Sequence, residues 1–99
     1  MYNICGKFYA TIFKLLQIII MYKSEKEIQA KIQDIASKLK QLRKDKGYTS
    51  YETFAFEHDL NRVQYWRVEN GQNITLKTLL NILSIHNLSI EEFFTEIPT

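Results

Sequence analysis

The chain has 99 residues, which is enough for one domain with a modest core and too few for an active-site cleft between two lobes. Its 13 basic and 11 acidic residues give a formal charge of +2, which neither requires nor excludes a polyanionic partner. A single cysteine, Cys5, excludes an intrachain disulfide and favours the reducing cytoplasm.

The first 22 residues differ from the rest. Residues 8–22 are strongly apolar, yet they are too few for a bilayer span, and Lys14 and Gln17 interrupt them. No cleavage pattern of a secretory signal follows. Residues 1–20 are either an upstream extension before a true start at Met21 or a segment for packing or dimerisation, with membrane attachment the least favoured alternative. We therefore separate an apolar extension, residues 1–22, from a helical domain, residues 23–99.

The first predicted helix begins at Glu25, because Ser24 and Glu27 have the spacing of a capping box. Apolar residues then recur every three or four positions, at Ile28, Ile32, Ile35, Leu39 and Leu42. Gly47 ends this helix. The same spacing permits a coiled-coil seam with a second copy, but so short a stripe favours packing into the chain's own core.

Basic residues crowd the same stretch of the chain, and the far end is acidic through Glu91, Glu92 and Glu96. Such uneven charge suits docking on phosphates through one end. Most of the basic run is nevertheless expected to be a solvated helix face. Only Lys44 and Lys46 lie near enough to the following turn to steer a phosphate-bearing partner.

Two short helices are predicted on either side of a polar break at His58–Asp59. The first is capped by Thr49 with Glu52, or alternatively by Ser50, and turns three residues inward: Phe54, Ala55 and His58. The second is capped by Asn61 with Gln64, ends at Asn70–Gly71, and is anchored by Leu60, Tyr65 and Val68. Trp66 faces outward in this pattern, and the alternative makes it a core residue.

Two further helices complete the chain. After Ile74–Thr75 comes a helix that is apolar on nearly all sides and is expected to be the buried centre, with Leu76, Leu79, Leu80, Ile82, Leu83 and Ile85. Ser89 with Glu92 caps a last helix whose inward residues are Ile90, Phe93 and Phe94. A strand could occur only within residues 8–22. The prediction is an all-α bundle of five helices.

The sequence resembles the Cro/repressor-type, or Xre-like, helix-turn-helix family over residues 34–95. The resemblance is carried by Leu42-Arg43-Lys44-Asp45-Lys46-Gly47, Ser50-Tyr51-Glu52-Thr53-Phe54-Ala55, Asn61-Arg62, Arg67-Val68-Glu69-Asn70-Gly71, Thr75-Leu76-Lys77-Thr78-Leu79-Leu80-Asn81-Ile82-Leu83 and Leu88-Ser89-Ile90-Glu91-Glu92-Phe93-Phe94. It implies that residues 50–57 lie across the DNA backbone and that residues 61–69 enter the major groove. The fold it implies is the five-helix, lambda-repressor-like one.

The resemblance also implies roles for individual residues. Base-edge contacts fall on Arg62, Val63 and Arg67, and Gln64 and Trp66 flank this face. Arginine can donate two parallel hydrogen bonds to guanine, and valine can rest on a thymine methyl. Phosphate contacts fall on Tyr51, Asn70, Thr75 and Lys77, and such contacts set register without reading sequence.

Arg43 and Glu69 match a buried ion pair of the family, with two solvated surface charges as the alternative. Two residues depart from the family pattern. Tyr51 stands where glutamine is usual, and Asp59 stands where glycine is usual in the turn. Aspartate tolerates the left-handed backbone conformation better than most residues. One extra residue also falls near Thr49.

Nothing in the sequence indicates catalysis. His58 and His86 are the two histidines, no cysteine or carboxylate cluster completes a metal site, and no phosphate-cradling glycine loop occurs. The predicted protein is a cytoplasmic, sequence-specific transcription regulator without a cofactor, which binds double-stranded DNA as a homodimer on an inverted repeat and is not attached to a membrane. The alternatives are the antitoxin of a toxin–antitoxin pair, with the toxin as protein partner, and a protein-interaction module that has lost DNA binding.

Overall fold

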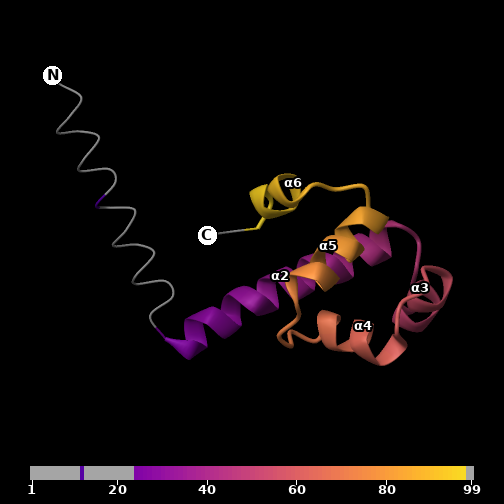
Figure 1. Ribbon diagram of the computed structural model, residues 1–99, viewed down its shortest axis with the longest axis horizontal. Coiled ribbons are helices and arrows are strands. Elements are labelled where there is room, and N and C mark those ends of the chain that lie inside the picture. The colour runs from indigo at the N-terminus through magenta and orange to yellow at the C-terminus, as the bar shows by residue number, and fades with distance from the viewer. Residues whose placement is uncertain (1–11, 13–23, 98–99) are drawn as a thin grey trace, which may run out of the picture. The chain divides into compact units, whose positions relative to one another are not determined.

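The computed structural model of the protein describes Ile12 and residues 24–97. Five helices lie within residues 24–97: α2 (Glu25–Asp45), α3 (Tyr51–Glu57), α4 (Arg62–Glu69), α5 (Leu76–Ile85) and α6 (Ile90–Thr95) (Figure 1). This stretch contains no strand. For residues 24–97, the prediction of an all-α bundle of five helices is confirmed.

The first of these helices, α2, follows its predicted limits. The Ser24 hydroxyl accepts a hydrogen bond from the Glu27 amide at 3.2 Å, and Gly47 follows the helix with a φ of 100°, a left-handed value that glycine adopts without strain. Leu39 is buried, and Ile35 and Leu42 pack against the core. The chain divides at Lys31–Ile32 into two compact units, and the core lies in the unit that starts at Ile32.

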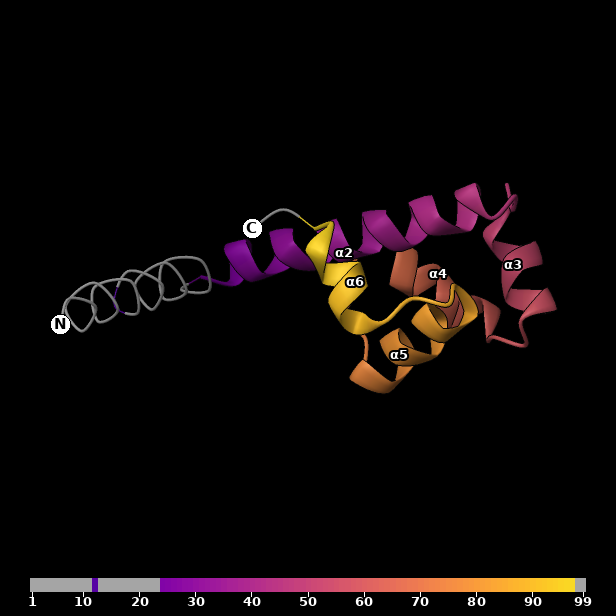
Figure 2. The ribbon, with the colours of Figure 1, turned by 90° about the horizontal axis from the view of Figure 1, so that it is seen from above.

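The centre of that core is aromatic. The Phe54 side chain is fully buried, and its ring centroid lies 5.1 Å from those of Tyr48 and Tyr65. The core cluster takes residues from all five helices, and its other large, fully buried side chains are Leu39, Val68, Ile82, Leu83 and Phe93. Figure 2 shows α4 and α5 on the same side of α2. The inward positions predicted for α3 and α4 are thus confirmed.

The prediction that α5 is buried on nearly all sides is wrong. Leu79, Ile82 and Leu83 are buried, but Leu76 is 62% exposed and Leu80 is 45% exposed. Phe94 of α6, which was expected to face inward, is exposed as well. In so small a unit, the other elements cover only one side of α5 and α6. The apolar pattern of a single helix does not show how many other elements are available to cover it.

Local hydrogen bonds explain where the last helix begins. The Ser89 hydroxyl accepts from the Glu92 amide at 3.1 Å, and the Ser89 amide donates to the Glu92 carboxylate at 2.9 Å. This is the predicted capping box. Hydrogen bonding by the Ser89 backbone, and then by its side chain, lowers the pKa of Glu92. Asn87 enters the turn before it with a positive φ of 55°. An ion pair between Lys38 and Glu96 ties α6 to α2.

Several predictions concern residues that the structure does not describe. Cys5, Met21 and the apolar run of residues 8–22, apart from Ile12, lie outside the described residues. The two interpretations of this extension, its boundary at residue 22 and any strand within it therefore stay predictions.

Candidate nucleic-acid interface

A buried ion pair fixes the end of α4 against α2. Arg43 donates from Nε to Glu69 Oε2 at 2.7 Å and from Nη2 to Glu69 Oε1 at 3.0 Å, and both side chains are buried. A third bond runs from Arg43 Nη1 to the carbonyl oxygen of Tyr48 at 2.8 Å, so the same guanidinium also holds the loop before α3. The bonds to Glu69 raise the pKa of Arg43. The arrangement is bidentate and leaves little freedom to either helix.

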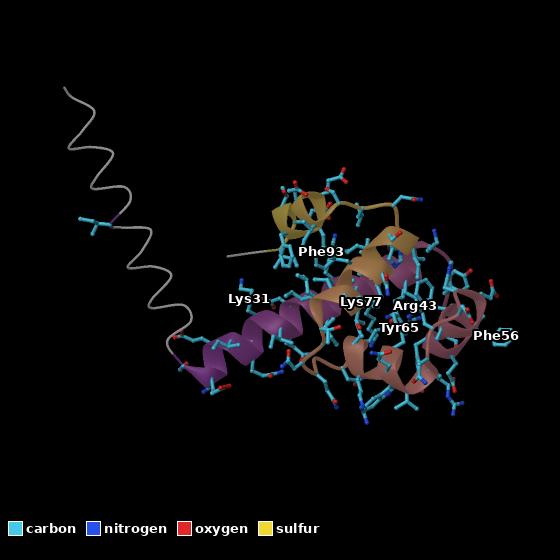
Figure 3. The ribbon with its side chains drawn as sticks, in the orientation of Figure 1. Lys31, Arg43, Phe56, Tyr65, Lys77 and Phe93 are labelled. Carbon is cyan, nitrogen blue, oxygen red and sulfur yellow. The ribbon has the colours of Figure 1, made fainter. Side chains whose placement is uncertain are left out.

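Next to this pair lies Tyr65, which points from α4 into the unit near Arg43 (Figure 3). Burial, and then the nearby Glu69 carboxylate, raise the pKa of the Tyr65 hydroxyl. Two turns of α4 are therefore anchored on one side, by Tyr65 and Val68 in the core and by Glu69 in the ion pair. The opposite side of the helix is held at a fixed position relative to α2.

The link between α3 and α4 is short and defined by caps. The Ser50 hydroxyl accepts from the amides of Glu52 and Thr53, so the predicted cap at Thr49 is wrong and the alternative, Ser50, caps α3. Asp59 makes the turn with a φ of 59°, the left-handed conformation expected of this departure from glycine. Asn61 then caps α4 by accepting from the Gln64 amide at 2.9 Å.

The outward side of α4 carries every residue predicted to face bases. The side chains of this set are all exposed, and the set comprises Arg62, Val63, Gln64, Trp66 and Arg67. Trp66 is 41% exposed, so the alternative that placed it in the core is wrong. Gln64 reaches sideways to the Thr78 hydroxyl of α5 at 3.4 Å. The helix thus combines a buried side and a polar, arginine-bearing side within eight residues.

The residues predicted to contact phosphates lie at the C-terminal end of α4 and at the starts of α3 and α5. Tyr51 is half-buried at the start of α3, and Lys77 is exposed in the first turn of α5. Asn70 donates to the Trp66 carbonyl at 2.8 Å, and Thr75 caps α5 by accepting from the Thr78 amide at 3.2 Å. The polar groups of Asn70 and Thr75 therefore already hold helix ends, which is an alternative reason for their presence.

A hollow of about 350 Å³ opens between α3 and α4, lined by Tyr51, Glu52, Arg62, Val63 and Trp66. The sequence prediction missed Glu52, because it assigned this residue to a capping box with Thr49. With Ser50 as the cap, the Glu52 carboxylate is free to lie 3.7 Å from the Arg62 guanidinium, and both side chains are largely exposed. A correct assignment of the cap to Ser50 in the sequence would have left Glu52 available to pair with Arg62.

Histidines far apart in the sequence meet around Phe54 in the structure. The ring centroids of His58 and His86 lie 4.6 Å and 5.5 Å from that of Phe54, and each histidine caps the C-terminus of its helix. Burial, followed by the charges of Lys46 and His58, lowers the pKa of His86. Among Ile12 and residues 24–97, no three histidine, cysteine, aspartate or glutamate residues are grouped to hold a metal ion.

In the part of the chain that the structure describes, no helix is long and apolar enough to cross a membrane.

Comparisons with known proteins add an independent finding. No protein-family model matches the sequence, and no solved structure matches the chain. The control protein C.MunI from Mycoplasma sp is 40% identical over 62 residues, which make up 62% of this chain and 84% of that protein. Its name describes a control protein and not an enzyme, in agreement with the predicted absence of catalysis. The chain belongs to the family of the control protein C.MunI.

Proposed function

We propose that the protein is a sequence-specific DNA-binding transcription regulator of the Cro/repressor type, which acts in the cytoplasm and inserts α4 into the major groove. One observation carries this proposal. The buried side of α4 is locked by Tyr65, Val68 and Glu69, while its arginine-bearing side is exposed. A rigid helix with such a face meets the geometric requirement for reading base edges.

The exposed residues have separate tasks in this proposal. Arg62 and Arg67 each donate two hydrogen bonds to a guanine, and Val63 contacts a methyl group. Gln64 and Trp66 lie beside them at the edge of the same face. Tyr51, Asn70, Thr75 and Lys77 contact phosphates and set the register of the helix in the groove. Arg43 and Glu69 keep the helix at its docking angle without touching DNA.

A relative supports the proposal for the regulated genes. Since the control protein C.MunI is a relative of this chain, the genes proposed for it are those of a restriction–modification system. Regulation is positional, because a protein that occupies a promoter either blocks polymerase or recruits it. A restriction endonuclease gene next to the gene of this chain is the expected genomic context.

The proposed active form is a homodimer on an inverted repeat, with two copies of α4 about 34 Å apart on one face of the duplex. Leu76 and Leu80 lie one turn apart on α5, and both are exposed apolar side chains. A second copy that buries this pair would remove apolar area from water on both subunits. Leu80→Asp is expected to yield a monomer in analytical ultracentrifugation with unchanged helix content, and a dimer of unchanged affinity would place the interface elsewhere.

The test of function is a fluorescence-anisotropy titration with the DNA upstream of the protein's own gene. Affinity is expected to fall steeply with salt, since basic groups release counterions from phosphates. Arg67→Ala should weaken binding to this DNA more than binding to unrelated DNA of the same length. An equal loss on both DNAs would mean that Arg67 contacts phosphate only.

A second candidate function is the protein-interaction module. The observation in its favour is Phe56 on α3, which is 85% exposed and points away from the rest of the unit (Figure 3). Large exposed apolar residues are common at protein interfaces. The absence of any DNA binding at low salt, together with a folded protein, would favour this function over regulation.

A further inference from the structure

A line of polar side chains joins α4 to the first turn of α5. The Gln64 Nε2 atom donates to the Thr78 hydroxyl oxygen at 3.4 Å, and the hydroxyl oxygens of Thr78 and Thr75 lie 3.0 Å apart. The Thr78 amide also donates to the Thr75 hydroxyl oxygen at 3.2 Å, which is the cap of α5. This cap uses only the amide of Thr78, so the hydrogen bond from Gln64 to the Thr78 hydroxyl is not required to begin the helix.

Thr78 is the member of this line that moves least. Its side chain is half-buried, whereas those of Gln64 and Thr75 are exposed. A branched Cβ restricts its rotamers within a helix, and the Thr75 hydroxyl holds its oxygen from one side. A glutamine side chain has more rotamers to lose when its end is held. Thr78 therefore limits the orientation of the Gln64 amide.

This hydrogen bond determines which polar atom of Gln64 is left for DNA. A glutamine amide has one oxygen that accepts and one nitrogen that donates, and both belong to the same planar group. When the nitrogen turns to Thr78, the oxygen lies on the other side of that group. In the major groove, adenine and cytosine present an amino donor, whereas guanine and thymine present a carbonyl acceptor at the corresponding atom. An amide oxygen pairs with the amino bases and is repelled by the carbonyl bases.

We propose that Thr78 is a positioning residue, which holds the Gln64 amide so that its oxygen faces the base edge and selects adenine or cytosine. The inference rests on the proposed DNA binding and specifies the base read at one position of each half-site. Thr78 acts through Gln64 and touches no base itself. When Thr75 donates its hydroxyl hydrogen to a phosphate, Thr78 donates its own to Thr75 and still accepts from Gln64, so each hydroxyl keeps its partners.

The experiment uses the full chain and a binding site selected from random DNA. Each base pair of this site is replaced in turn, A·T by G·C or the reverse with the purine on the same strand, which exchanges amino and carbonyl groups in the major groove. Fluorescence anisotropy measures the affinity for every replaced site. At one position of each half-site, exchange of the amino group should lower the affinity of the original protein about fivefold, the value of one neutral hydrogen bond.

Matched variants connect this preference to the Thr78 hydroxyl. Thr78→Val keeps the shape of the side chain and removes the hydroxyl, so the released amide can turn either atom to the base, and the preference ratio should fall to near one. Thr78→Ala lacks the hydroxyl as well and should give the same result, whereas Thr78→Ser should keep the preference. Thr95→Val is the control, because it removes a hydroxyl that donates to the Glu91 carbonyl on α6 at 2.7 Å, and it should leave the preference unchanged. Circular dichroism and thermal unfolding check that each variant is folded.

A double-mutant cycle tests the route from Thr78 to DNA. Gln64→Ala should abolish the preference at the same position, and Thr78→Val should add no further change in that background. A further change of preference in the double variant overturns the proposal, because Thr78 then acts through another residue.

The outcomes separate the role of Thr78 from the function on which it rests. If Thr78→Val binds selectively with the base preferences of the original protein, the role of Thr78 is overturned and the DNA-binding function stands. A lower melting temperature without a change in base preference has the same meaning, since a purely structural contact would give that result. No binding to any DNA in the selection overturns both the function and the inference.

Discussion

The two ends of α4 each carry an arginine–glutamate pair, and the pairs differ in burial. At the C-terminal end, Arg43 and Glu69 are buried and form two hydrogen bonds of 2.7 Å and 3.0 Å. At the N-terminal end, Arg62 and Glu52 are exposed and lie 3.7 Å apart. Water screens the second pair and leaves the first unscreened. The same chemistry therefore fixes the helix at one end and stays available for a ligand at the other.

The strongest way to break this comparison is Glu69→Ala. The substitution leaves the Arg43 guanidinium buried without its carboxylate, and we expect a loss of about 3–5 kcal/mol in the free energy of unfolding. Urea denaturation monitored by circular dichroism measures this loss, and thermal unfolding should shift in the same direction. A melting temperature equal to that of the original protein would refute the structural importance of the buried pair.

Removal of the exposed arginine should lower the affinity for DNA and leave the stability of the fold unchanged. Arg62→Ala is expected to weaken binding to the selected DNA site by about 1–3 kcal/mol, the value of a bidentate contact to guanine. The melting temperature should hardly change, because the Arg62 side chain is 65% exposed. Anisotropy titrations and thermal unfolding on the same preparation test both statements. Unchanged affinity would remove Arg62 from the proposed base contacts.

A third prediction concerns how the stability of the aromatic core around Phe54 depends on pH. His86 Nε2 is buried and has no hydrogen-bond partner within the described residues, and its pKa lies below the ordinary value of 6.5. The unfolded chain therefore takes up a proton more readily than the folded one. This contribution to stability is complete above about pH 6.5 and decreases as the pH falls below it.

The variant His86→Gln should reduce the decrease in melting temperature between about pH 7.5 and pH 5.5. His58 and Lys46 face His86 and are kept in the variant, so the difference between the two slopes reports His86. Equal slopes for the two proteins would show that His86 protonates equally well in both states. A guanidinium does not titrate in this range, so the Arg43 contribution stays constant.

The smallest effect is expected from Glu52→Gln, the matched control for Glu69→Ala. Exposed pairs of this kind contribute about 0–1 kcal/mol, and 0.1 M salt lowers that further. The free energy of unfolding should therefore stay within about 0.5 kcal/mol of the original value. A loss as large as that of Glu69→Ala would contradict the distinction drawn between the two ends of α4.

Local sequence predicted the helix limits well because caps involve residues two or three positions apart. Ser24, Asn61 and Ser89 cap as expected, and Asp59 adopts the left-handed turn. The choice between Thr49 and Ser50 could not be made from spacing, since both have acceptor hydroxyls near the same amides. That one-residue difference hid the pair of Glu52 and Arg62, and with it the hollow.

Within residues 24–97, the sequence by itself determined five helices, their order and the inward positions of α3 and α4, because helical periodicity and caps act within a few residues. Only the tertiary structure decided that Leu76, Leu80 and Phe94 stay exposed, and that His58 and His86 meet at Phe54. Burial depends on how many neighbours a small unit can supply, and pairing depends on which helix ends come together. Neither quantity is contained in the pattern of one segment.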